Sequence, residues 1–61
     1  MKLKPGFEFK YEHYFSGEIH RTFQVTYPGV AFPTKLAEAS FLTIECANAW
    51  GNEQAKKFNA I

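Results

Sequence analysis

The sequence predicts an α+β domain, in which an antiparallel β-hairpin packs on one main α-helix and a short C-terminal helix follows. Residues 7–15 and 19–27 alternate apolar and polar side chains with the period of two that is typical of half-buried strands. Residues 35–50 are mostly good helix formers, and they follow a proline. At 61 residues the chain is predicted to be one small domain spanning residues 1–61.

The hairpin begins with residues 7–15, in which aromatic rings and one histidine occupy one face and mostly charged residues occupy the other. Residues 19–27 alternate in the same way and form the second strand. The intervening residues 16–18 include a glycine and are typical of a hairpin loop. The second strand then ends because Pro28 and Gly29 suit the two central positions of a type II turn.

The length of the hairpin loop determines how the two strands pair, because a shift of one residue turns a whole strand over. A three-residue loop pairs Phe15 with Ile19. The same register sets Phe7 opposite Tyr27, so that the apolar side chains of both strands share one face. We expect this register, although a bulge or a five-residue loop would preserve the same facing.

The main helix is predicted over residues 35–50. Pro33 suits a helix start, and Thr34 beside it is a suitable N-cap. Gly51 makes a natural C-terminal stop, after which residues 53–59 form a short second helix. The alternative is one helix that continues through Gly51, at a cost of about 1 kcal/mol relative to alanine.

The composition gives little support for catalysis or for binding to polyanions. A formal net charge of +1, with dispersed basic residues, is too small to attract nucleic acid or an acidic membrane. Cys46 is the single cysteine, and with His13 and His20 it cannot form a closed zinc site. The two histidines face opposite sides of the hairpin, and Cys46 lies within the predicted helix without an evident base. We therefore expect no enzyme, no cofactor and no metal site.

The sequence also bears on localisation. No apolar stretch approaches the length of a membrane span, and the N-terminus has no apolar run of the kind that signal peptides contain. A free cysteine favours a reducing compartment. We expect a cytoplasmic protein without a membrane partner.

The predicted helix has almost no polar face, because Phe41 and Leu42 flank a thin stripe of Glu38 and Glu45. A two-stranded hairpin covers only one side of a helix and is barely stable alone. Either the C-terminal segment covers the remaining apolar surface within a monomer, or another macromolecule does. The residues expected to bind a partner are Phe41, Leu42, Glu38, Glu45, Tyr14 and His20.

The favoured function is non-catalytic binding to a protein partner, with inhibition of that partner as one form of it. The small size and hairpin-plus-helix plan are similar in kind to phage-borne and mobile-element proteins that occupy a host protein's surface. A homodimer formed through the hairpin edge is a further arrangement. Alternative functions are a structural subunit of a larger assembly and a nucleic-acid-binding module. The latter would use Lys10, Tyr14, His20, Lys56 and Lys57.

Overall fold

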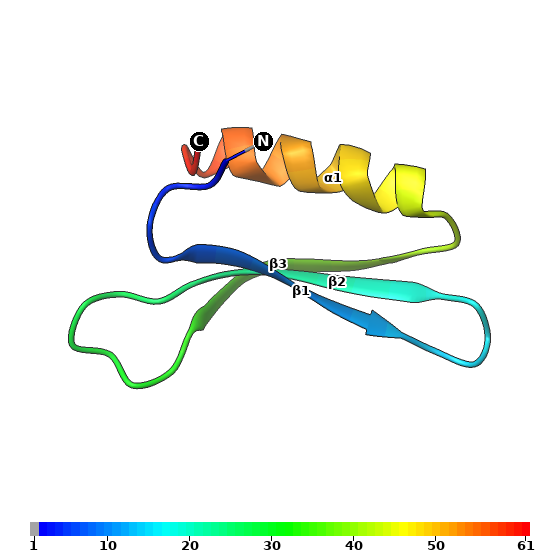
Figure 1. The fold of residues 1–61 in the computed structure, drawn as a ribbon, viewed down its shortest axis with the longest axis horizontal. Coiled ribbons are helices and arrows are strands. Elements are labelled where there is room, and N and C mark those ends of the chain that lie inside the picture. The colour runs from blue at the N-terminus through cyan, green and yellow to red at the C-terminus, as the bar shows by residue number, and fades with distance from the viewer. Residues whose placement is uncertain (1) are drawn as a thin grey trace.

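The computed structural model describes residues 2–61, which form three antiparallel strands followed by one α-helix (Figure 1). Strands β1 (Phe7–His13), β2 (Ile19–Val25) and β3 (Thr34–Phe41) pair in the order β1-β2-β3. Helix α1 (Ile44–Lys57) lies across one face of this sheet. The predicted α+β class is confirmed, with a third strand that the sequence did not indicate.

The pairing of β1 with β2 differs from the predicted register by two residues. Phe7 lies opposite Val25 rather than Tyr27, and the connecting loop spans residues 14–18. Gly17 adopts a left-handed conformation in this loop, with φ of +90°, at a position that a side chain would disfavour. Because the shift is an even number of residues, both strands keep their predicted facing although every predicted pair is wrong.

The predicted helix over residues 35–50 is wrong in its first half. Thr34–Phe41 form strand β3, which pairs antiparallel with β2. The helix begins after Thr43, whose hydroxyl accepts a hydrogen bond from the backbone N–H of Cys46 at 3.2 Å. The alanines and glutamate of β3 are good helix formers, but pairing with β2 outweighs that weak intrinsic preference.

The C-terminal part of the chain continues a single helix. Helix α1 runs through Gly51 without a break, so the predicted separate helix over residues 53–59 is not found. A Schellman motif ends α1: Asn59 has a positive φ of 54°, and the N–H of Ala60 donates to the carbonyl of Ala55 at 2.8 Å. The stop signal is therefore an asparagine near the C-terminus rather than the earlier glycine.

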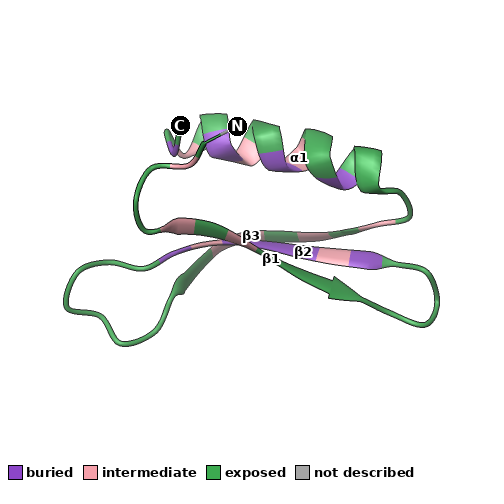
Figure 2. Cartoon of the chain, viewed as in Figure 1, coloured by how far each residue is buried: buried purple, intermediate pink, exposed green. Residues whose placement is uncertain are grey.

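The core lies between α1 and the sheet, where Figure 2 shows buried segments of both α1 and β2. Its centre is Phe23 of β2, which is fully buried. The Phe23 ring centroid lies 5.7 Å from that of Phe7 and 4.8 Å from that of Phe9. From the helix side, Phe58 approaches it at 5.8 Å. Leu36 lies at a β-bulge in the β2–β3 pairing and packs against the same cluster. Phe7, Phe9 and Phe23 of the hairpin's aromatic face thus line the core, as the alternation predicts, whereas Tyr11 and His13 of the same face are exposed.

Candidate functional site

The candidate sites of this protein are exposed surfaces. Residues 2–61 form no pocket and bring together no group of three or more side chains that could hold a metal ion. No helix in this part of the chain is long and apolar enough to cross a membrane. Cys46 is exposed in the first turn of α1, outside the core.

One face of the sheet packs against α1, and the other, which we call the open face, has no element over it within residues 2–61 (Figure 1). Two lysines and three glutamates give the open face a formal charge of −1 when its histidine is neutral. Such a surface is polar and carries no net positive charge. Its residues are Glu8, Lys10, Glu12, His20, Thr22, Gln24, Lys35, Glu38 and Ser40.

A hydrogen-bond network crosses the open face from β2 to β3. One ring nitrogen of His20, Nδ1, lies 3.0 Å from the hydroxyl of Ser40, and the other, Nε2, lies 3.2 Å from Glu38 Oε2. The order of hydroxyl, imidazole and carboxylate is that of a catalytic triad. What the structure shows is a cross-strand hydrogen-bond network between β2 and β3.

The carboxylate of Glu38 should make the protein sensitive to acid. Hydrogen bonds from Lys35, at 3.0 Å, and from His20 lower the pKa of Glu38 below its usual value of 4.5. A carboxyl group with a lowered folded-state pKa stabilises the fold above pH 4.5, and this contribution is lost as the pH falls further. Glu38→Gln should therefore lower stability at neutral pH and lose less stability on acidification than the parent does.

Urea midpoints at neutral pH and at about pH 3 would measure this difference. Glu53→Gln is a matched control, because Glu53 is an exposed glutamate of α1 outside the network. An acid loss in Glu38→Gln as large as in the parent would contradict the proposed role of Glu38.

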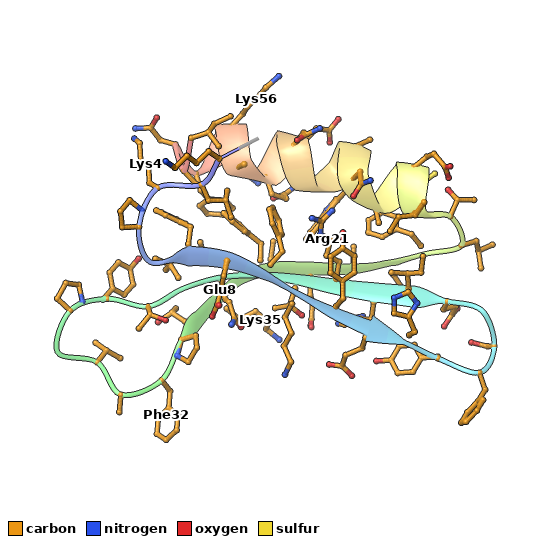
Figure 3. The ribbon with its side chains drawn as sticks, viewed as in Figure 1. Lys4, Glu8, Arg21, Phe32, Lys35 and Lys56 are labelled. Atoms are coloured by element: carbon orange, nitrogen blue, oxygen red, sulfur yellow. The ribbon has the colours of Figure 1, made fainter. Side chains whose placement is uncertain are left out.

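Arg21 is the one charged side chain that is buried among residues 2–61, with 7% of its surface exposed, and it lies between the sheet and α1 (Figure 3). Its Nη1 donates to the carbonyl of Ala47 at 2.8 Å and to Asn48 Oδ1 at 3.2 Å. The guanidinium carbon lies 4.1 Å from the ring centroid of Phe9 and 4.5 Å from that of Tyr11. These contacts fasten the helix to the first two strands.

No carboxylate partners this buried guanidinium in the described chain, and its Nε has no acceptor there. Burial lowers the pKa of Arg21 from its usual value, since a charge is less stable away from water. Gly51 lies directly over the group: a Cβ atom built there would be 2.7 Å from Arg21 Nη1. The sequence pattern indicated a helix stop at Gly51, whereas the structure shows a position where the helix must approach Arg21 closely.

Large apolar side chains are exposed at one end of the molecule, which we call the hairpin end and define by Phe15, Leu42 and Ile44. Figure 1 places the β1–β2 loop and the β3–α1 turn together at this end. Phe15 is fully exposed and Leu42 is 78% exposed. Neither side chain contributes to the core cluster.

A second exposed apolar surface lies at the opposite end, where the β2–β3 connection extends beyond the sheet (Figures 1 and 2). We call residues 26–33 the apolar loop, because this segment contains no charged residue. Phe32, two positions before β3, is 79% exposed, and Figure 3 shows its side chain pointing away from the sheet. Tyr27 and Val30 are about half exposed beside it. The uncharged run was a signal for this surface, but Pro28 and Gly29 indicated only a turn and Pro33 a helix start.

Tyr14 and His20 were predicted on the hairpin and the other four partner-binding residues on one helix stripe, but the structure places Glu38 on β3 beside His20. Tyr14, His20 and Glu38 come together at the open face, where the ring centroids of Tyr14 and His20 are 6.3 Å apart. The other three lie at the β3–α1 turn, because the helix that was to align them begins only after that turn. They are Phe41, Leu42 and Glu45.

These last three residues differ in their environment. Phe41 is half-buried, and its ring centroid lies 5.6 Å from that of Trp50, so its ring packs between β3 and α1. Leu42 and Glu45 are exposed. A charged residue in place of Phe41 would therefore disturb the fold, whereas the same change at Leu42 would alter only an exposed position.

The residues of the alternative nucleic-acid surface do not share one side of the molecule. Lys10 and His20 belong to the open face. Lys56 lies on the outer side of α1, across the molecule from Lys35 of the open face (Figure 3). The basic side chains therefore do not converge on one phosphate-binding surface.

Comparisons with known proteins identify no relative. The chain matches no protein-family model, no curated protein and no solved structure. The surfaces described above are therefore the basis for a functional proposal.

Proposed function

We propose that this protein is a non-catalytic module that binds a protein partner, with the apolar loop as its anchor. The observation that carries this proposal is the exposure of Phe32, at 79%, within an uncharged segment that projects beyond the sheet. Contiguous exposed apolar patches mark contact sites, and Phe32 shares its segment with the half-exposed Tyr27 and Val30. Aromatic side chains are also enriched among the residues that dominate binding energies at interfaces.

The conformation of the apolar loop supports this role. The N–H of Val30 donates to the carbonyl of Tyr27 at 3.1 Å, which closes a turn around Pro28 and Gly29. Gly29 has a φ of +82°, as the third residue of a type II turn requires. This turn holds residues 27–30, so that part of the loop loses less conformational entropy on binding than a flexible segment does, and this favours affinity.

The partner is a protein rather than a nucleic acid in this proposal, because the loop offers aromatic rings and itself contains no basic residue. If the loop occupies a functional surface of the partner, it inhibits that partner. Phage-type proteins of similarly small size act in this way. A single cysteine, which permits no internal disulfide, is compatible with action in a reducing cytoplasm. A structural subunit would use the same contact without inhibition.

Phe32→Asp is expected to abolish partner binding and leave the fold intact, since the ring is exposed and outside the core. A charge placed in a desolvated contact should weaken binding by at least about a hundredfold, on the scale of hot-spot substitutions. Immobilised parent and variant proteins would be exposed to a lysate of the source cells, and captured proteins compared quantitatively. Circular dichroism would verify the fold of each variant.

Leu42→Asp is the matched control, because Leu42 is an equally exposed apolar residue at the hairpin end. A partner lost from Phe32→Asp and retained by Leu42→Asp supports the apolar loop as the anchor. The reverse result would place the contact at the hairpin end. Added salt separates the alternative function, since phosphate contacts weaken steeply with salt whereas an apolar contact hardly changes.

A further inference from the structure

The sheet has two outer strands within residues 2–61, and β1 is the less protected of them. Strand β3 contains a β-bulge, which is one of the devices that block the addition of another strand. Strand β1 pairs regularly with β2 over all seven residues and contains neither a bulge nor a proline. Its free edge is therefore a regular template for strand addition.

The backbone groups at this free edge belong to odd-numbered residues. The N–H of Thr26 donates to the carbonyl of Gly6, and that of Tyr14 donates to the carbonyl of Glu18, at the two ends of the β1–β2 pairing. Hydrogen-bonded pairs recur at every second residue of an antiparallel pair, so the even-numbered residues of β1 bond β2. Groups that point away from β2 are those of Phe9, Tyr11 and His13.

The exposed part of β1 is its second half. All four residues from Lys10 to His13 are exposed, whereas Phe7 and Phe9 are partly covered. Helix α1 packs against β2 and β3, which leaves Tyr11 on β1 with 40% of its surface exposed. The free backbone groups and the uncovered side chains therefore coincide around Tyr11.

We propose that two copies of the chain pair antiparallel through β1, with the two-fold axis at Tyr11. Tyr11 then pairs with Tyr11 of the second copy, and Phe9 pairs with His13 of the second copy. All three residues donate and accept backbone hydrogen bonds across the new pair. The result is a six-stranded sheet with both helices on the same side. This contact lies apart from the apolar loop, so it goes beyond the proposed function.

Charge complementarity on the open face favours this register. With the axis at Tyr11, Lys10 faces Glu12 of the second copy, and the two-fold symmetry makes this attraction twice. An axis one residue earlier, at Lys10, would set Lys10 against its own copy and Glu8 against Glu12. Like charges would then oppose each other along the whole contact.

An axis at Phe9 would also match charges, but it uses a backbone group that is already occupied. That register pairs Phe7 with Tyr11 of the second copy, and the N–H of Phe7 already donates to the carbonyl of Lys4 at 3.2 Å. The axis at Tyr11 needs only groups that are free in the monomer. It is therefore the register that satisfies both the charges and the hydrogen bonds.

The test is the mass of the full chain, measured by light scattering behind a sizing column over a wide range of concentration. The parent should dimerise, and Lys10→Glu should raise the dimer dissociation constant about tenfold or more, because two attractive pairs become repulsive. Glu12→Lys should act alike, and the double variant Lys10→Glu/Glu12→Lys should recover the parent's constant. Both side chains are exposed on the open face, so each monomer is expected to fold.

Recovery in the double variant would establish the pairing of Lys10 with Glu12 and hence the axis at Tyr11. A parent that stays monomeric at every concentration would overturn the proposal. A dimer that is indifferent to Lys10→Glu and Glu12→Lys would also overturn it, because the contact would then lie elsewhere. A dimer weakened by Glu8→Lys but not by Glu12→Lys would reject the Tyr11 axis in favour of Phe9.

Discussion

Replacing Phe23 with alanine is expected to remove a large part or all of the stability of this protein. Phe23 is fully buried and contacts rings from β1 and from the segment after α1. Truncation of a buried phenylalanine costs about 3 to 5 kcal/mol. A chain of 61 residues has a total stability on the order of 3 to 9 kcal/mol. The substitution therefore removes an amount comparable with the whole.

Urea unfolding, followed by circular dichroism and by the fluorescence of Trp50, would measure this loss. Phe32→Ala is the matched control, since it removes the same ring from an exposed position and should change stability by less than about 0.5 kcal/mol. A loss below about 1 kcal/mol in Phe23→Ala would mean that the ring is not the centre of the core.

Gly51→Ala is expected to lower the stability of the parent, which has Arg21, and to raise the stability of a variant that has alanine at position 21. In the parent, the added Cβ would lie 2.7 Å from Arg21 Nη1 and 3.0 Å from Cζ. The guanidinium cannot retreat easily, because Ala47 and Asn48 accept its hydrogen bonds and two rings enclose it. We expect Gly51→Ala to destabilise the parent by about 1 to 3 kcal/mol, as overpacking does.

Arg21→Ala alone should cost about 2 to 4 kcal/mol, through lost packing of the side-chain stem and lost hydrogen bonds. In that background, Gly51→Ala meets no guanidinium and should stabilise the protein by about 1 kcal/mol, the helix preference of alanine over glycine. A double-mutant cycle measured in urea, with sucrose added to keep the weakest variant folded, would reveal the reversal. Stabilisation of the parent by Gly51→Ala would show that Arg21 is not held in place.

The candidate surfaces were only partly accessible to sequence reasoning. Leu42 was predicted as a partner-binding residue, and it is exposed, but for a different reason: it lies in a turn rather than on a helix. Phe41 was predicted beside it and instead packs on Trp50. The apolar loop was missed because Pro28 and Gly29 explain a turn without reference to the exposure of its neighbours.

By itself, the sequence determined the α+β class and the facing of the first two strands. In β1 and β2, aromatic rings alternate with polar residues, and this assigns one face of each strand to the core. The assignment holds even if the pairing of the two strands is shifted by an even number of residues. This information is local, because each side chain's direction follows from its position along a strand.

Only the tertiary structure decided the pairing, the third strand and the role of Gly51. Residues 34–41 have helix-forming side chains whose intrinsic preferences are worth a few tenths of a kcal/mol each, and pairing with β2 outweighs them. Gly51 likewise satisfies the local rule for a helix stop, yet the helix continues and approaches Arg21, which lies thirty positions earlier in the chain. The physical reason is the same in both cases: contacts between distant residues exceed local preferences, and a local pattern does not reveal those contacts.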